Sequence, residues 1–217
     1  EDQTEYGVTL IGGDTIRIRD GLTLSLTAFG EVPEGEALRR STARAGDDIY
    51  VSGTIGDAAL GLRVAQGGLT DLSDGERSVL LSRYRMPQPR TELGKRLIGT
   101  ASAAIDISDG LVADLGHLCT ASALGARIEA AVVPLSPAAR AACAADTKLL
   151  ARALSGGDDY ELLFTAPQAV ADKLAAVARD ADVALSRIGA LDTDLGVRMM
   201  AADGEEMHFA NTGYSHL

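Results

Sequence analysis

The sequence predicts an α+β fold with a mixed sheet. Stretches with the spacing of amphipathic helices interleave with short apolar or alternating stretches typical of strands. Two Asp-Gly pairs, Asp20-Gly21 and Asp203-Gly204, are typical of tight hairpin turns and therefore predict antiparallel pairing. The chain has 217 residues, of which 46% are hydrophobic and 24% charged, so it is long and apolar enough to bury a sizeable core.

The first strands are expected near the N-terminus. Residues 8–11 form a short apolar run. Residues 22–29 alternate between apolar and polar side chains, and the preceding Asp20-Gly21 predicts that they pair with residues 17–19. Glycine and proline punctuate the chain between Gly30 and Gly46, where we place a domain boundary.

The rest of the chain is expected to alternate helices and strands. Pro87-Gln88-Pro89 separates two helical patterns, because neither helix can continue through it. Gly125 suits the position just after a helix. The expected helices are 58–66, 74–85, 91–103, 111–125, 137–153 and 169–181, and the expected strands are 48–53, 104–107, 127–133, 160–165 and 183–188, followed by a hairpin at 203–204.

The net charge argues against several classes of partner, and the cysteine content indicates the redox setting. The net charge of −11 repels nucleic acid and anionic membrane surfaces, and it repels a phosphate substrate too unless cations reverse the local field. No apolar run is long enough to span a bilayer as a helix. Cys119 and Cys143 lack metal-type spacing, which favours a reduced, cytoplasmic setting over a disulfide framework.

An apolar strand runs into a turn that carries Asp106, Ser108 and Asp109, and a helical pattern follows at once. The first N–H groups of a helix have no partner within it, so such a turn can offer carboxylates to a hard cation and backbone donors to a phosphate. Gly12-Gly13-Asp14 and Gly156-Gly157-Asp158 are similar segments. Three such turns predict a polyphosphate–metal site, with the alternative that Asp and Gly are ordinary turn residues.

Magnesium is the expected metal. Mg²⁺ prefers octahedral oxygen coordination with one or two carboxylates beside substrate phosphates, which suits Asp14, Asp106 and Asp109. Arg40 lies in a basic cluster that can supply a charge-assisted phosphate contact, or it is simply a solvated surface residue. The sequence contains no G-x-x-x-x-G-K-[ST] segment, no H-R-D motif and no G-x-S-x-G elbow, which argues against P-loop enzymes, protein kinases and serine hydrolases.

Eight segments together carry a resemblance to a known family: 10–15, 38–41, 46–53, 83–90, 105–111, 114–117, 154–162 and 213–216. In order and spacing, over essentially the whole chain, they resemble the bacterial thiamine-monophosphate kinases. The combination of segments is much more specific than any one of them.

The resemblance implies the fold of the aminoimidazole ribonucleotide synthetase-like superfamily, with an α/β N-terminal domain and an α+β C-terminal domain. Residues 1–38 then correspond to the last strands of a truncated N-terminal domain that binds ATP and metal, and residues 39–217 to the C-terminal domain. The implied activity is transfer of the ATP γ-phosphoryl group to thiamine monophosphate with Mg²⁺, giving thiamine diphosphate. A cytoplasmic enzyme is implied, and a homodimer for the complete protein.

The resemblance also implies roles for single residues. Asp158 stands where the family commonly has Glu, and Ile16 where it usually has Thr. The resemblance implies no catalytic side chain. It assigns Asp14, Asp106 and Asp109 to metal and Asp158 and Tyr214 to the thiamine substrate. It assigns Gly13, Asp14, Arg40 and Ser108 to ATP.

Upstream carboxylates that supply further metal ligands in the family are not part of this sequence, so we expect the chain by itself to be inactive. With their neighbours missing, residues 8–11 and 22–29 are expected to expose apolar surface and to promote self-association or disorder. Two alternatives remain open: a nucleotide-binding module without catalysis, and another ATP-dependent enzyme of the same superfamily.

Overall fold

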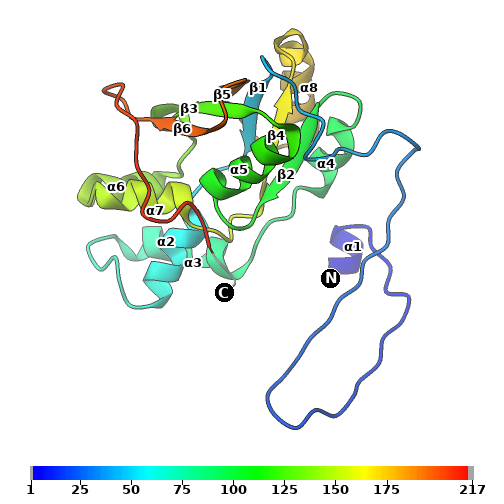
Figure 1. The fold of residues 1–217 in the computed structure, drawn as a ribbon. Helices are drawn as coiled ribbons and strands as arrows, with labels where there is room; N and C mark the ends of the chain where they lie inside the picture. The colour runs from blue at the N-terminus through cyan, green and yellow to red at the C-terminus, as the bar shows by residue number, and fades with distance from the viewer. Residues whose placement is uncertain (1, 215–217) are drawn as a thin grey trace. The chain divides into compact units, whose positions relative to one another are not determined.

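The computed structural model describes residues 2–214, which divide into two units with the boundary between Ala37 and Leu38. The unit that begins at Leu38 holds all the strands of the described chain and its hydrophobic core (Figure 1). No helix among residues 2–214 is both long and apolar enough to cross a membrane.

A six-stranded sheet with the order β2-β4-β1-β5-β3-β6 forms the centre of this unit. Every neighbouring pair is antiparallel except β3 and β6, which are parallel. The mixed sheet confirms the predicted α+β class. Its strands are β1 (Asp48–Ser52), β2 (Ala103–Ile107), β3 (Gly125–Glu129), β4 (Glu161–Ala166), β5 (Leu185–Asp192) and β6 (Gly196–Met200).

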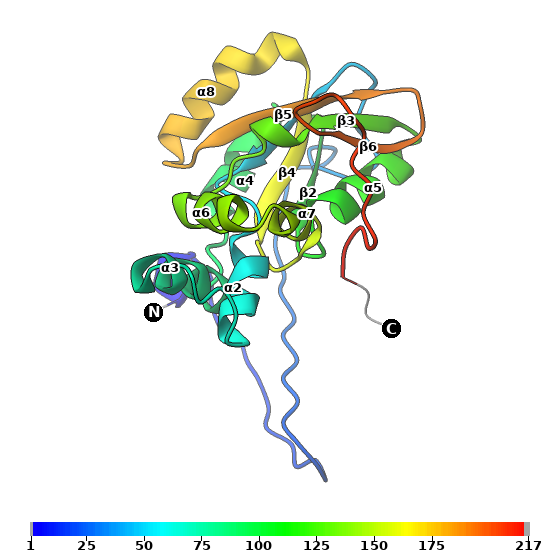
Figure 2. The ribbon, with the colours of Figure 1, turned by 90° about the vertical axis from the view of Figure 1, so that its left-hand side faces the viewer.

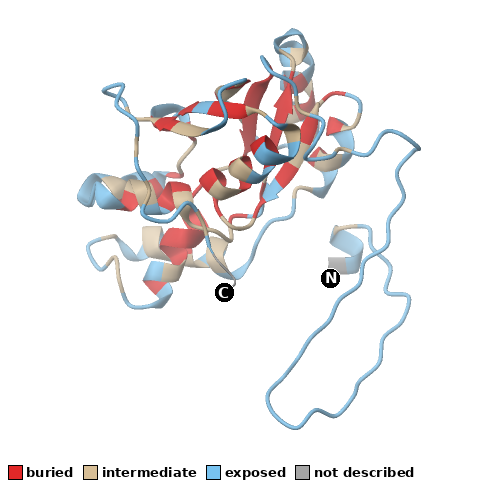
Figure 3. Cartoon of the chain, in the orientation of Figure 1, coloured by how far each residue is buried: buried red, intermediate tan, exposed pale blue. Residues whose placement is uncertain are grey.

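Helices cover both faces of the sheet (Figures 1 and 2). On one face α5 (Leu111–Ser122) packs on Ile49, Val51 and other core residues. On the other face α4 (Thr91–Leu97) and α8 (Ala171–Asp180) pack around the stacked rings of Tyr50 and Phe164. Because successive residues of β1 alternate between the faces, all five of its positions are buried (Figure 3).

A separate helical cluster lies beside the sheet and forms its own apolar core. Leu60 and Leu80 are fully buried there, and small alanines allow close packing. The helices are α2 (Asp57–Ala65), α3 (Asp74–Arg85), α6 (Pro137–Ala145) and α7 (Lys148–Ser155). Helix α3 has the predicted bounds and begins with a capping box between Ser73 and Glu76.

Several predicted boundaries are wrong for local reasons. Helix α4 ends at Leu97, because Gly99 adopts a positive φ and Ser102 then donates to Thr165 of the sheet. The predicted helix 137–153 is two helices, since Asp146 leaves the helical conformation and its side chain accepts from the N–H of Lys148.

Gly125 does not end a helix as predicted. Helix α5 ends at Ser122, with Ala123 in the left-handed region, and Gly125 begins β3. A Cβ at Gly125 would overlap the carbonyl oxygen of Asp194, so glycine serves a close backbone approach there. Strand β3 stops at Glu129, and Ala130–Val132 form a 3₁₀ turn. The predicted hairpin at Asp203-Gly204 is confirmed by the bridge between Met200 and Glu206.

The N-terminal unit contains α1 (Asp2–Glu5) and no strand among its described residues, so the predicted strands at 8–11, 17–19 and 22–29 are wrong. Gly21 does adopt the turn conformation, with φ of +72°, but no ladder forms beside it. The alternating apolar side chains are open to solvent, with Leu24 87% and Leu26 90% exposed. A period-two pattern forms a strand only where a partner and a covering layer exist.

Candidate active site

The candidate site begins at the carboxyl end of β2. Ile105 and Ile107 of this strand are buried, whereas Asp106 between them points to the other face and is exposed. Ser108, Asp109 and Gly110 then connect β2 to the first residue of α5. The local sequence thus places two carboxylates and a hydroxyl on one short turn.

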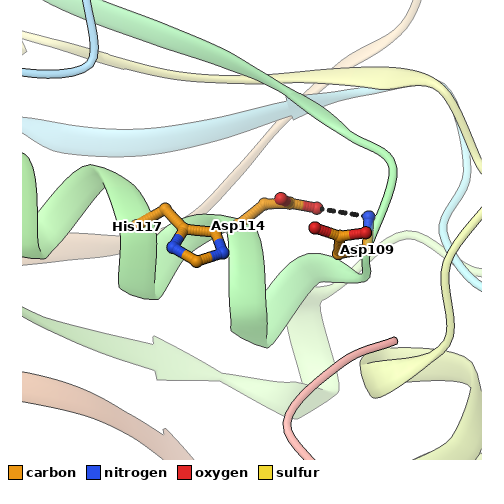
Figure 4. A group of neighbouring side chains, drawn as sticks. All are labelled: Asp109, Asp114 and His117. Atoms are coloured by element: carbon orange, nitrogen blue, oxygen red, sulfur yellow. Dashed lines mark hydrogen bonds between the residues drawn. The ribbon is translucent and has the colours of Figure 1, made fainter. Parts of the chain in front are cut away.

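A single carboxylate oxygen organises the backbone of this turn. Oδ2 of Asp114 accepts hydrogen bonds from the N–H groups of Ser108, Asp109 and Gly110, each at 3.0 Å (Figure 4 shows the bond from Asp109). Asp114 is only 2% exposed. Burial raises its pKa, and the hydrogen bonds from Asp109 and Gly110 counteract that shift. The N–H groups of Ser108, Asp109 and Gly110 are therefore already bound to Asp114.

The carbonyl groups of the same turn are also engaged. The N–H of Tyr160 donates to Ile107 O at 2.8 Å, and the N–H of Asp158 donates to Ser108 O at 2.9 Å. The N–H of Tyr214 donates to Asp109 O, also at 2.9 Å. Three segments distant in sequence are thus joined directly by main-chain hydrogen bonds.

Glycines make this close approach possible. Gly110 has φ of +126°, and a Cβ there would lie 2.6 Å from the carbonyl oxygen of Ser155. A Cβ at Gly157 would overlap the carbonyl oxygen of Ser108, and one at Gly213 would overlap the side chain of Ala113. These glycines allow the turn to be closely enclosed by backbone.

The segment around Asp159 holds unfavourable backbone conformations. Asp158 has φ of +72° and Tyr160 has φ of +49°, which are uncommon values for residues other than glycine. Asp159 between them is buried and accepts from the N–H groups of Gly56 at 2.6 Å and Ala58 at 3.1 Å. Burial raises the pKa of Asp159 to about 7. These bonds tie the segment to the start of α2 and help to maintain the strain.

Glu161 fixes the other side of this segment. Its side chain is fully buried and accepts from Arg83 at 2.8 Å and from Arg90 at 2.7 and 2.6 Å. The hydroxyl of Ser52 donates to the same carboxylate. A buried carboxylate is tolerated only when it is paired in this way, so Glu161 cross-links β4, β1 and α3 to the segment after α3.

A cleft of about 1050 Å³ opens over the turn. It is lined by polar groups from the turn together with aromatic rings and carboxylates from the later segments. They include Ser108, Asp109, Asp158, Tyr160, Phe209 and Tyr214. The phenol oxygen of Tyr160 lies 3.4 Å from Oδ1 of Asp158.

Tyr160 also lines a second groove of about 470 Å³. Pro87, Pro89 and Leu162 give this groove apolar walls, and Asp106 lines it as well. Tyr160 is thus common to both spaces, and it is a site residue that the sequence analysis did not assign.

The structure brings together Asp106, Ser108, Asp109, Asp158 and Tyr214 of the predicted site, through the turn and its main-chain partners. Ser215 and His216 of the segment 213–216 lie outside the described residues.

Arg40 is not brought to the turn. Its carbonyl oxygen accepts from the hydroxyl of Ser122, the last residue of α5, about 17 Å along the helix axis from Leu111 at its start. Gly13 and Asp14 belong to the N-terminal unit, and both are exposed there.

The donor set suits a hard cation. Asp106 and Asp109 offer carboxylate oxygens and Ser108 a hydroxyl, the ligand types that Mg²⁺ prefers. One ligand atom each from Asp109, Asp114 and His117 also lies within 4.8 Å of the others (Figure 4). Oδ2 of Asp114 is occupied by three N–H groups, so its hydrogen bonds support a structural role within this group.

Comparison with known proteins places the chain among relatives of the same architecture. Residues 44–200 match the family described as AIR synthase related protein, C-terminal domain. The thiamine-monophosphate kinase of Salmonella typhimurium is 43% identical over 208 residues, which are 96% of this chain and 60% of that protein. The chain thus spans about 60% of the length of that curated relative.

Solved structures agree with this similarity. Thiamine-monophosphate kinase from Stenotrophomonas maltophilia K279a superimposes with a TM-score of 0.73 at 43% identity, covering 81% of this chain and 56% of that one. AaThiL complexed with AMPPCP and TMP gives a TM-score of 0.69 at 31% identity, covering 83% of this chain and 54% of that one.

Proposed function

The chain belongs to the AIR synthase related protein family through its C-terminal domain, and we propose that it acts in ATP-dependent phosphorylation of thiamine monophosphate to thiamine diphosphate. The observation that carries the proposal is the direct hydrogen bonding between the turn of Ser108 and Asp109 and the segments of Asp158 and Tyr214. A phosphoryl transferase must hold a charged phosphate donor and its acceptor side by side. The likeness to AaThiL, solved with AMPPCP and TMP, supports this pair of substrates.

Asp106 and Asp109 are proposed as ligands of Mg²⁺, and Asp14 of the N-terminal unit is likewise proposed as a metal ligand. Bound Mg²⁺ neutralises charge on the β- and γ-phosphates. Ser108 contributes a hydroxyl beside these carboxylates. Phosphoryl transfer depends mainly on positioning and electrostatic stabilisation, so the site needs no protein nucleophile.

The cleft suits the acceptor. The thiazolium ring of thiamine is a flat cation, and a cation is stabilised both by carboxylates and by the faces of aromatic rings. Asp158 supplies a carboxylate, and Tyr160 and Tyr214 supply rings on the cleft wall. We assign Asp158 and Tyr214 to the thiamine substrate on this basis, with Asp158 reaching less far than the Glu common in the family.

The nucleotide is assigned to Gly13, Asp14, Arg40 and Ser108. Because Arg40 lies near the far end of α5, we expect it to contact a part of ATP remote from the phosphates at Asp109. Ile16 offers no hydroxyl beside Asp14, so we expect the metal at that turn to keep an additional water.

We also infer a cytoplasmic enzyme that is a homodimer in its full-length form. The reduced cysteines, of which Cys119 is buried, fit the first inference. The exposed apolar side chains of residues 8–32 fit the second, because pairing of such a segment would remove them from water.

The second candidate is a nucleotide-binding module without catalysis, which the exposed, strand-free N-terminal unit favours for this chain alone. Phosphorylation assays with ATP, Mg²⁺ and thiamine monophosphate decide between the two. They compare this chain with a full-length form, meaning the chain together with an N-terminal region of the size found in its relatives. We expect turnover of about 1 s⁻¹ or faster for the full-length form and almost none for this chain.

An inactive full-length form would contradict the proposed kinase. Turnover by this chain alone at the full-length rate would contradict the need for upstream metal ligands. Nucleotide binding by this chain, measured calorimetrically without turnover, is the result expected from a module.

A further inference from the structure

Asp114 has a geometry that its place in the chain does not suggest. It belongs to the first turn of α5, yet its Oδ2 accepts from the N–H groups of the three residues before the helix. An anion at a helix start is ordinarily a ligand phosphate or a capping side chain that precedes the helix. Here the anion comes from the helix itself.

We propose that Asp114 is a positioning residue that takes the place of a bound phosphate oxygen at the N–H groups of Ser108, Asp109 and Gly110. The turn then receives phosphate through cations held by Asp106 and Asp109 and through the Ser108 hydroxyl, not through these backbone donors. The inference deepens the proposed function and rests on it for the metal role of those two carboxylates. What the inference adds is that Asp114 fixes the backbone of the turn, whereas Asp106 and Asp109 face the ligand.

The first argument concerns donors. With three N–H groups bound to Asp114, the turn presents no free backbone donor at Ser108, Asp109 or Gly110 to a phosphate. Asp106 and Asp109 add negative charge at the same place. A phosphate is repelled there unless a cation intervenes.

The second argument concerns rigidity. Hydrogen bonds to an ionised carboxylate are about twice as strong as neutral ones, so three of them hold the turn firmly. The carbonyl groups of Ile107, Ser108 and Asp109 also accept hydrogen bonds, from the backbone N–H groups of Tyr160, Asp158 and Tyr214. Asp114 therefore fixes the backbone of Asp109 directly and the substrate segments through one further bond.

The alternative is that Asp114 itself is a ligand, together with Asp109 and His117. The ligand role and the positioning role of Asp114 differ in whether they require His117. A ligand set of these three requires its imidazole, whereas the positioning role does not involve it. His117 is exposed, so its replacement leaves the packing of α5 unchanged.

The test measures binding of Mn²⁺ alone, as a paramagnetic substitute for Mg²⁺, to the full-length form by electron paramagnetic resonance. We expect Asp114→Ala to bind Mn²⁺ about 10- to 100-fold more weakly than the parent, the usual effect of losing a residue that orients metal ligands. Asp114→Asn should bind with a smaller loss, because its neutral oxygen still accepts these bonds. His117→Ala should bind like the parent.

A matched control separates positioning from general destabilisation. Asp57 is as buried as Asp114, but it accepts from Thr54 and Ser136 at the start of α2 and not from the N–H groups of the metal turn. Asp57→Asn should lower the melting temperature and leave the Mn²⁺ affinity unchanged. If Asp114→Ala does not fold, Asp114→Asn carries the same comparison.

Parent-like Mn²⁺ affinity in the Asp114 variants overturns the inference. So does equal weakening by His117→Ala, which identifies a ligand set, and so does a parent that binds no Mn²⁺. A parent that binds Mn²⁺ but does not phosphorylate thiamine monophosphate contradicts the proposed function instead, because the binding comparison does not use turnover.

Discussion

The sequence predicts short turns of small residues around one carboxylate at Gly12-Gly13-Asp14 and at Ser108-Asp109-Gly110, but of these two the structure bends the chain at the second alone. At Gly12 and Gly13 a Cβ would meet nothing within 4 Å, and within residues 2–214 Asp14 accepts from the adjacent N–H of Thr15 alone. The second turn is closed by hydrogen bonds on both its N–H and C=O sides.

The difference teaches that a glycine–aspartate segment becomes a fixed site only through what surrounds it. The sequence of each turn permits the geometry. Asp114, Gly157 and Gly213 from elsewhere in the chain impose it on the second turn. The N-terminal turn has no such surroundings within its own unit.

The largest expected effect tests whether the two turns are equal in function despite this contrast. In the full-length form, Asp109→Asn and Asp14→Asn should each lower kcat by about 100-fold or more at saturating Mg²⁺, because a lost ligand to a catalytic cation is worth several kcal/mol. Steady-state kinetics with ATP and thiamine monophosphate measure this.

Thermal unfolding is the control for those variants. Asp109→Asn should melt at the parent temperature or slightly above, since one of several repelling carboxylates is gone. Activity within about twofold of the parent would remove the metal role and leave a turn-forming one.

Glycine replacements sharpen the structural side of the comparison. Gly110→Ala forces a left-handed φ on alanine and a clash with the carbonyl of Ser155, and should cost about 2 kcal/mol of unfolding free energy. Gly12→Ala should cost less than about 0.5 kcal/mol. Urea denaturation of both variants measures the difference, and equal costs would show that the two turns are equally free.

The pH dependence of stability examines the segment that closes the second turn. The pKa of Asp159 rises from 3.8 to about 7, so between these values the folded state keeps a proton that the unfolded state has lost. This carboxyl's stabilising contribution is therefore full below about pH 4 and is lost as the pH rises through 7, by at most about 1.4 kcal/mol per pH unit.

The asparagine in Asp159→Asn does not titrate. The free energy of unfolding of this variant, relative to that of the parent, should therefore increase as the pH rises from 5 to 8, by at most about 1.4 kcal/mol per pH unit. Urea denaturation of both proteins at several pH values measures it. A constant difference across this range would mean that Asp159 is ionised throughout.

The smallest expected effect lies in the N-terminal unit. Leu24 is 87% exposed, so Leu24→Thr should change the free energy of unfolding by less than about 0.5 kcal/mol. It should, however, reduce self-association of this chain, because it removes exposed apolar surface. Sedimentation velocity tests the second expectation, and a parent that is strictly monomeric would contradict it.

The elements after Asp48 were largely predictable from the sequence, because caps, prolines and apolar spacing act locally. Helix α3 has its predicted bounds for that reason. The N-terminal segment was not predictable in this way. The alternation in residues 22–29 indicates which side chains would face a core, but it does not show whether a partner strand and a covering layer are present.

The site divides in the same way. Asp106, Ser108 and Asp109 are neighbours in sequence, so their proximity could be predicted without knowing the fold. Asp158 was singled out as part of a similar glycine–aspartate segment, but its contact with this turn had no local signal, because long-range backbone hydrogen bonds leave no local pattern. The substrate roles of Asp158 and Tyr214 came from the resemblance. Asp114 was missed as an organising residue, since a carboxylate early in a helix is most simply a solvated one.

The order of the strands has a consequence for how the protein is made. Strand β1 pairs with β4 and β5, which follow it by about 115 and about 140 residues, so the ribosome releases the partners of β1 long after β1 itself. Closure of such long loops is slow, and an unpaired apolar strand is prone to aggregate while it waits. The turn at Asp109 acquires its hydrogen bond from Tyr214 only after about 105 further residues have been made, so the ligand cleft forms long after the turn itself has left the ribosome.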